Sequence, residues 1–343
     1  MRAALLEKPH RLSVVDRPLR LISSEEVLVR VQSCGVCGTD IHIVEGESRC
    51  NLPVILGHEY AGVVEDVGTN VKDFVPGQRV AVDPNISCGT CYFCRRGEVH
   101  LCSNLQALGV DIDGGMAELC IVPRKQLFQL PDNFPIEASS FIEPVSCVLH
   151  GIDRTHVAIG DTVVIIGGGT IGLMMLQLVR SAGASIIIVI EPNEQKRIIA
   201  KKLGATCVCD PKIENVHAVV MDLTNVGADI VIECSGITAS AESAMCLARR
   251  GGTIELFGVC PFGHKISIEP HQIYFKELTI VGSYINPQTF ARSINVLASG
   301  MVRVDELPVH RFSLENVHEA LLYQKEGRTI KSIIEPNGSI HMQ

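Results

Sequence analysis

The stretch TVVIIGGGTIGLMMLQLVRSAGA, residues 162–184, decides how a large part of this chain folds. It opens with a short valine- and isoleucine-rich run of the length of a buried strand. After three consecutive glycines, a mostly apolar segment of helical length runs to Gly183, a residue type that commonly ends helices. Residues 162–179 contain no charged side chain, but the glycines divide them into pieces too short to cross a membrane. The stretch therefore predicts a buried strand, a tight loop and a helix.

The glycines in this loop match a dinucleotide-binding pattern. Gly167, Gly169 and Gly172 satisfy G-x-G-x-x-G, and Thr170 and Ile171 lie between the last two. The first glycine permits a tight turn, the second lets the backbone approach a pyrophosphate, and the third allows close helix–strand packing. The N–H groups at the start of the helix favour the phosphates. A glycine-rich turn in an ordinary α/β domain is the alternative, but the strand before the motif and the helix after it favour a cofactor site.

An acidic residue follows at the distance expected for ribose recognition. Glu191 lies nineteen residues after Gly172, at the end of the next predicted strand. A carboxylate there accepts hydrogen bonds from the ribose hydroxyls and repels a 2′-phosphate. Pro192 and Asn193 follow it, and Arg197 lies one or two helical turns further on. The sequence therefore favours NAD over NADP.

Strands and helices alternate on both sides of the glycine motif, which predicts a doubly wound parallel sheet over residues 151–286. Residues 1–150 contain short β-like runs separated by glycine- and proline-rich breaks, and predict an irregular antiparallel β domain. Residues 287–343 are interpreted as a return to this first domain. The fold class is therefore α/β with two domains. The segments that alternate are SIIIVIE, NEQKRIIAKKLGA, ADIVIECSG, GGTIELFG and LTIVGSY.

A second motif lies in residues 87–102, SCGTCYFCRRGEVHLC. Cys88, Cys91, Cys94 and Cys102 have the spacing C-x₂-C-x₂-C-x₇-C. Four thiolates fill the tetrahedral shell of zinc and leave no open position, which is typical of a structural site. An iron–sulfur cluster and a pair of disulfides are the alternatives. His100 competes as a ligand in principle, but four cysteines already complete the shell.

Composition limits the partners and the compartment. The 343 residues are 46% hydrophobic, and a formal net charge of −8 argues against nucleic acid or an anionic membrane as the main partner. The N-terminus has no signal-peptide pattern. Fourteen cysteines without such a signal indicate a reducing, cytoplasmic setting, where clustered thiols bind metal more often than they form disulfides.

The motifs together resemble the zinc-dependent medium-chain dehydrogenases, specifically the polyol (sorbitol) dehydrogenase-like subgroup, over nearly the whole chain. The matching segments are CGVCGTD, GHEYAGVVEDVGTNVKDFVPGQRV, the four-cysteine loop, EPVSCVLHG and the glycine motif, in the family's order. The resemblance implies a GroES-like catalytic domain, a Rossmann domain that binds NAD, and two zinc ions per chain, one catalytic and one structural.

The resemblance also implies the ligands of the catalytic zinc. It assigns Cys37 and His58 to the metal, with Glu59 beside it; from the residues alone, Cys34 is as good a candidate as Cys37. The third ligand is expected at Glu143, in the Glu-Pro pair that polyol dehydrogenases carry where classical alcohol dehydrogenases have a cysteine. Glu143 would bind zinc directly or through water. Cys147, four residues later, is interpreted as a small buried residue.

Thr39 and His42 match positions that form a hydroxyl–imidazole proton relay in related enzymes. Histidine titrates near neutral pH, which suits such a role. The alternative for His42 is an ordinary surface histidine near the cleft.

The implied function is oxidation of a secondary alcohol of a polyol or sugar-derived substrate to a ketone, with hydride transfer to NAD. An L-threonine 3-dehydrogenase-like or phosphorylated-polyol dehydrogenase activity is the alternative within the enzyme class. More remote are a non-catalytic NAD-binding protein and a zinc-independent reductase, which would normally lack Cys37, His58 or Glu143. The family also implies a homodimer or homotetramer, with ELTIVGSYI as a candidate edge strand.

Overall fold

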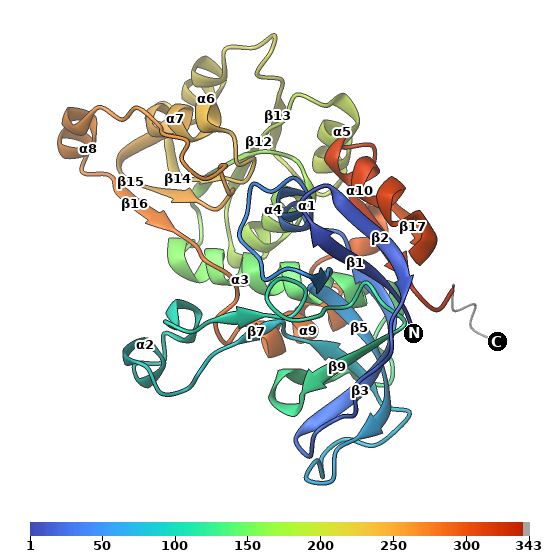
Figure 1. Ribbon diagram of the computed structural model, residues 1–343. Coiled ribbons are helices and arrows are strands. Elements are labelled where there is room, and N and C mark those ends of the chain that lie inside the picture. The colour runs from blue at the N-terminus through green and yellow to red at the C-terminus, as the bar shows by residue number, and fades with distance from the viewer. Residues whose placement is uncertain (339–343) are drawn as a thin grey trace. The chain divides into compact units, whose positions relative to one another are not determined.

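The computed structural model describes residues 1–338 (Figure 1). The chain forms two compact units. The first contains Met1–Pro144, Ser293–Ala298 and the segment from Leu307 to the end of the described chain. The second contains Val145–Arg292 and Ser299–Glu306.

The first unit is built on a mixed seven-stranded sheet. Its strand order is β10-β6-β5-β3-β18-β17, and β9 pairs with β3 off this path. A three-stranded sheet, β2-β1-β4, and the two-stranded β7-β8 complete the unit. Its strands are β1 (Arg2–Lys8), β2 (Arg11–Asp16), β3 (Glu26–Gly35), β4 (Val54–Ile55), β5 (Glu59–Val67), β6 (Arg79–Val82), β7 (Asn85–Ile86), β8 (Gln106–Ala107), β9 (Leu119–Pro123), β10 (Leu127–Gln129), β17 (Val309–Ser313) and β18 (Lys331–Glu335).

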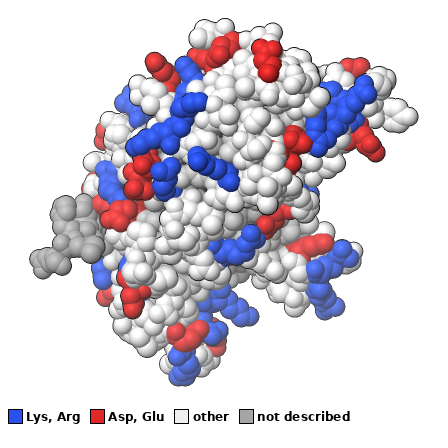
Figure 2. All heavy atoms as spheres, turned by 180° about the vertical axis from the view of Figure 1, so that it is seen from behind, with Lys and Arg blue, Asp and Glu red and all other residues white. Residues whose placement is uncertain are grey.

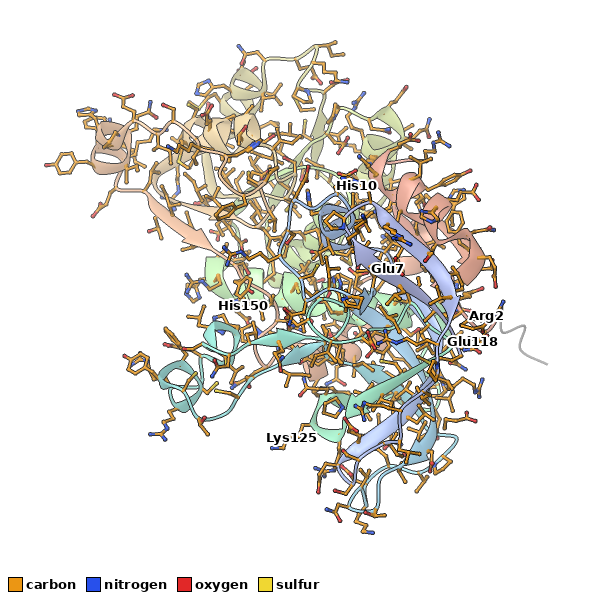
Figure 3. All side chains as sticks on the ribbon, viewed as in Figure 1. Arg2, Glu7, His10, Glu118, Lys125 and His150 are labelled. Carbon is orange, nitrogen blue, oxygen red and sulfur yellow. The ribbon has the colours of Figure 1, made fainter. Side chains whose placement is uncertain are left out.

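Strand β3 is the centre of this sheet. It pairs antiparallel with β5, β9 and β18. Val27, Val29 and Val31 alternate with less buried residues along it and are fully buried in the core. This two-residue period is the one expected of a strand with one face on a core. Arg2 and Glu118 are labelled in Figure 3, and Arg2 Nε donates a hydrogen bond to Glu118 Oε1 at 2.8 Å.

Few helices belong to the first unit. They are α1 (Gly38–Val44), α2 (Tyr92–Arg95) and α10 (Val317–Lys325). Helix α3 (Ile142–Thr155) begins in the first unit and continues in the second, and α9 (Phe290–Ala298) also spans the boundary.

The second unit is a six-stranded sheet with the order β13-β12-β11-β14-β15-β16, and every neighbouring pair is parallel. The sheet thus grows outward in both directions from β11, so the predicted doubly wound architecture is confirmed. Its elements are β11 (Thr162–Ile166), α4 (Thr170–Ala182), β12 (Ile186–Ile190), α5 (Glu194–Lys202), β13 (Cys207–Cys209), α6 (Val216–Thr224), β14 (Ala228–Glu233), α7 (Thr238–Leu247), β15 (Ala248–Leu256), α8 (Pro270–Lys276) and β16 (Thr279–Gly282).

Burial explains why the opening stretch forms these elements. Every residue of β11 is buried, as expected of a strand covered on both faces. Met174 and Met175 of α4 are fully buried, as predicted for a core helix face. Helix α4 ends at Gly183, whose φ of 112° lies in the left-handed region that favours glycine.

Charges of both signs alternate on the face shown in Figure 2, where Lys and Arg side chains lie among Asp and Glu. Among residues 1–338, no helix is long and apolar enough to cross a membrane.

One carboxylate in the second unit is buried without a partner. Glu255 of β15 is fully buried, and neither of its side-chain oxygens has a hydrogen-bond partner within the described part of the chain. Its carboxylate packs close to Gly151, where an added Cβ would lie 2.7 Å from Oε1. Burial raises the pKa of Glu255 to about 8, and the positive charge of Arg154 opposes this only in part. The folded protein therefore holds Glu255 protonated at neutral pH.

This burial predicts a pH-dependent stability. Because the pKa of Glu255 is about 8 in the folded state and near 4.5 in the unfolded chain, folding binds a proton between these values. The free energy of unfolding should then fall as pH rises from 5 to 8, by up to about 3–5 kcal/mol. In Glu255→Gln this part of the slope should disappear. Urea denaturation at several pH values measures it, and equal slopes in both proteins would show that Glu255 is not the cause.

Candidate functional site

Cys37 lies directly after the central strand of the first unit. Strand β3 ends at Gly35, and Cys37 is the N-cap of α1. Its backbone N–H donates to Asp40 Oδ2 at 2.8 Å, and its Sγ lies 3.7 Å from Thr39 Oγ1. Cys34, in contrast, is fully buried within β3, and this burial raises the pKa of its thiol well above the usual value. A metal needs the thiolate form, so the structure favours Cys37 as a ligand.

Strand pairing places His58 and Glu59 close to Cys37. Glu59 is the first residue of β5 and pairs with Gly35 of β3, so His58 is held beside the start of α1. Gly57 precedes them with a φ of 93°, which permits the turn into the strand. One ligand atom from each of Cys37, His58 and Glu59 lies within 4.8 Å of the others.

The electrostatics of this group suit a cation. His58 is buried, and among residues 1–338 its Nδ1 has no partner of good hydrogen-bond geometry, with Asp40 Oδ1 at 3.4 Å. Burial alone would lower the pKa of His58, but the negative charges of Asp40 and Cys37 raise it well above its ordinary value. A sulfur, an imidazole nitrogen and a carboxylate around a site that stabilises positive charge fit a zinc ion.

A buried lysine completes the site, and the sequence pattern did not reveal it. Lys331 begins β18, pairs with the carboxylate of Glu59, and is only 2% exposed. Burial alone would lower the pKa of Lys331, but Glu59 foremost, with Cys37 and Glu143, raises it. The only sequence signal is a lone lysine beside the apolar run of β18.

Glu143 is buried in the first turn of α3. Its charge acts on Lys331, so it belongs to the same electrostatic neighbourhood, but it is not one of the three residues whose ligand atoms lie mutually close. Cys147, on the same helix, is partly exposed, so the prediction that it is buried was wrong.

The expected relay residues Thr39 and His42 both lie on α1. His42 Nδ1 lies 2.6 Å from Glu47 Oε2, and the His42 side chain is 35% exposed. Glu47 is a partner that the motif did not indicate.

The four cysteines of the loop 87–102 form a second cluster. Their sulfur atoms lie within 4.8 Å of one another, and all four are free thiols. The N–H groups of Cys88 and Asn104 donate to Cys102 Sγ at 3.3 and 3.4 Å. Hydrogen bonds from backbone N–H groups lower the pKa of Cys88 to about 6 and that of Cys91 to about 7, whereas burial raises the pKa of Cys94 to about 11. A closed set of four sulfurs, two of them easily deprotonated, fits a structural zinc.

The glycine loop has the shape of a dinucleotide cradle. Gly167 has a φ of 105° and lies against Ser235, which follows the neighbouring strand β14. A side chain on Gly172 would collide with the Gly167 carbonyl, whereas at Gly169 the space is open. Thr170 and Ile171 begin α4, whose N-cap is Gly169. The open side of the loop fits a pyrophosphate.

Glu191 lies against this loop. Its carboxylate accepts hydrogen bonds from the N–H of Gly168 at 2.7 Å and of Asn193 at 2.8 Å. Arg197 donates to the Glu191 carbonyl and pairs with Asp210 at 3.0 Å. The guanidinium is therefore already engaged by protein oxygens.

Comparison with known proteins agrees with this geometry. Residues 23–132 match the alcohol dehydrogenase GroES-like domain, and residues 170–299 match the zinc-binding dehydrogenase domain. D-arabinitol dehydrogenase 1 of Uromyces fabae is 33% identical over 98% of this chain and 97% of its own length. The chain belongs to the zinc-binding alcohol dehydrogenase family. It is an oxidoreductase, and the predicted GroES-like and Rossmann domains are confirmed.

The names of other similar proteins give different substrates and cofactors. Sorbitol dehydrogenase of Bacillus subtilis is 32% identical, and each chain is covered over 98%. L-threonine 3-dehydrogenase of Pyrococcus furiosus is 35% identical over 90% of each chain. A zinc-binding dehydrogenase from Sinorhizobium meliloti bound to NADP is 39% identical, with a TM-score of 0.93 over 98% of this chain and 99% of its own. An Escherichia coli enzyme described as a short chain alcohol dehydrogenase, complexed with NADH, is 29% identical, with a TM-score of 0.91 over 98% and 99%.

The family supplies the chemistry that the two sites fit. Zinc, when bound, acts as a Lewis acid on an alcohol oxygen, and the nicotinamide dinucleotide accepts the hydride. The chain's own residues provide the anionic and imidazole donors, the buried Glu59–Lys331 pair beside them, and the glycine cradle.

Mutation should affect the two cysteine-containing sites differently. Cys91→Ser should release one zinc per chain and lower the melting temperature by several degrees, because a metal bound by all four cysteines would hold the turns of the loop 87–102 together. Cys37→Ser should also release one zinc, but lower turnover by more than about 100-fold with little change in melting temperature. Zinc analysis, thermal denaturation and turnover of both variants measure this. A stable, inactive Cys91→Ser protein would reverse the assignment.

Proposed function

We propose that this enzyme oxidises a secondary alcohol of a polyol or sugar-derived substrate to the ketone and transfers the hydride to NAD. The observation that carries the substrate class is the Glu143-Pro144 pair, with its carboxylate buried in the neighbourhood of Lys331, where classical alcohol dehydrogenases have a cysteine. The similarity to arabinitol and sorbitol dehydrogenases over 98% of the chain supports it.

The proposed roles follow from the chemistry of each group. Cys37, His58 and Glu143 hold the catalytic zinc, the last directly or through water, and Glu59 lies beside it. Thr39 and His42 carry the hydroxyl proton away from the reacting oxygen. Cys88, Cys91, Cys94 and Cys102 hold the structural zinc. Because Cys37, His58 and Glu143 are all present in the sequence, a catalytic enzyme is favoured over a non-catalytic NAD-binding protein or a zinc-independent reductase.

A substrate screen tests the proposal. Polyols, phosphorylated polyols and L-threonine are offered with NAD, and NADH formation is followed by absorbance. We expect kcat/KM for at least one polyol to exceed that for L-threonine by more than about tenfold, since a site built for a substrate's polar groups discriminates strongly. A preference for L-threonine or for a phosphorylated polyol would select the alternative, and the similarity to L-threonine 3-dehydrogenase makes threonine the sharper competitor.

NAD is proposed as the cofactor because Glu191 lies at the glycine loop and Arg197 is engaged by Asp210. A similar protein, 39% identical, is bound to NADP, so the preference of this enzyme for NAD over NADP should be measured directly.

Glu191→Gln removes the negative charge at this position with little change in side-chain shape, so it tests the effect of the charge alone. The amide oxygen still accepts one backbone hydrogen bond, so the loop should fold, but the charge that repels a 2′-phosphate is lost. We expect kcat/KM with NAD to fall about 10-fold or more and the preference for NAD over NADP to narrow. Steady-state kinetics with both cofactors measure it. A wild-type enzyme that prefers NADP would contradict the proposed role of Glu191.

A homodimer or homotetramer and a cytoplasmic location are also proposed. Strand β16 is an edge of its sheet, and its backbone is available for pairing with a second copy. Exposed aromatic side chains lie near it in the chain: Tyr274 (86%), Phe275 (56%) and Tyr284 (55%). All fourteen cysteines are free thiols, which suits a reducing compartment.

A further inference from the structure

We propose that Glu47 is a positioning residue for His42: it accepts the Nδ1 hydrogen bond, fixes the tautomer of the ring and leaves Nε2 to receive the proton. This inference rests on the proposed function, because it gives His42 its place in the relay. It adds a residue that lies outside the zinc ligands and the glycine loop.

The backbone folds so that Glu47 returns to His42. Helix α1 ends at Val44, and Gly46 follows with a φ of 78°, which turns the chain back. The N–H groups of Glu47 and Ser48 then both donate to the carbonyl of His42, at 2.8 and 3.2 Å. The same turn brings Glu47 Oε2 to 2.6 Å from His42 Nδ1. The pair is therefore held by main-chain geometry as well as by the side chains.

The neighbouring carboxylate on this turn, Glu45, has a partner of its own. Glu45 pairs with Lys325, at the end of α10. Glu45 makes the largest contribution to the raised pKa of Lys325, and the negative charges of Glu47 and Glu326 raise this pKa further. From the strand side, His10, labelled in Figure 3, donates its backbone N–H to the Val44 carbonyl at 2.7 Å. Glu47 is thus the carboxylate that contacts the His42 ring, and Glu45 is not.

The chemistry of the two groups sets the tautomer. An ionised carboxylate only accepts hydrogen bonds, so the nitrogen that faces Glu47 carries the proton. In the neutral ring, Nε2 is then the acceptor. When a proton bonds to Nε2 and the donor's O–H bond breaks, the ring becomes a cation, and the adjacent carboxylate stabilises it. His42 and Glu47 are 35% and 45% exposed, so the proton can pass from the ring to water.

The kinetic test compares two isosteric changes on one turn. Glu47→Gln should lower kcat/KM for the best alcohol of the screen about 5- to 10-fold, the scale of one charge-assisted hydrogen bond after solvent screening. Glu45→Gln, the matched control, removes a partly exposed charge on the same turn, 27% exposed against 45% for Glu47, that does not contact the ring, and should stay within about twofold. Equal losses in the two variants would overturn the proposal.

A double-mutant cycle separates positioning from a structural effect. In a His42→Gln background, Glu47→Gln should cause no further loss, because the group through which it acts is absent. An additional 5- to 10-fold loss in that background would show that Glu47 acts through the fold instead.

The third readout does not require a substrate. In protein labelled with ¹⁵N-histidine, the ring shifts of His42 should show the Nδ1–H tautomer in the wild type and a mixture of tautomers in Glu47→Gln. If no alcohol in the screen is oxidised, the proposed function fails while this measurement still decides whether Glu47 fixes the ring. An unchanged tautomer in Glu47→Gln would overturn the inference even if the enzyme is an active polyol dehydrogenase.

Discussion

The candidate metal site around Cys37 depends on the close packing of two oppositely charged side chains against Gly35. Gly35 is the last residue of β3, and it pairs with Glu59 of β5 on one side and with Ile333 of β18 on the other. A Cβ at this position would collide with the carboxylate of Glu59 and lie 2.7 Å from Lys331 Cε. A larger residue at Gly35 would therefore displace the Glu59 and Lys331 side chains from their present positions.

The Glu59–Lys331 pair explains how so much charge is buried in one place. An unpaired buried carboxylate is costly, but one with a buried cation partner is much less so. Lys331 also interacts with Glu143 and Cys37, so a single ammonium group offsets three anionic groups. Asp40 supplies a further fixed charge: it accepts a hydrogen bond from the Cys37 N–H and lies beside His58. The donors that fit zinc are thus embedded in a network of fixed charges.

The four-cysteine cluster is built on a different principle. Its ligands come from sixteen consecutive residues and from short turns whose N–H groups point at sulfur. It needs no long-range strand pairing to bring the thiols together. The Cys37 site, in contrast, draws on β3, α1, β5, β18 and α3, so its geometry is sensitive to the packing of the whole first unit.

The features of this protein that depend on short segments could be predicted from the order of the residues. The alternation of apolar strands and helices predicted the doubly wound sheet, the glycine spacing predicted the tight loop between β11 and α4, and the spacing of Cys88 to Cys102 predicted the clustering of four thiols. Residue periodicity and motif spacing are properties of short segments, and short segments can be interpreted without a fold. Naming Cys37 and His58 required the resemblance to a family.

Contacts between residues far apart in the chain, or brought together by a turn, were revealed only by the folded structure. It placed Lys331 on Glu59 across 272 positions, buried Cys34 and left Cys37 at the site, and returned Glu47 to His42. It also showed Glu255 without a hydrogen-bond partner inside the parallel sheet. These features arise from strand register and desolvation, which depend on which surfaces meet in the folded chain and not on the identity of neighbouring residues.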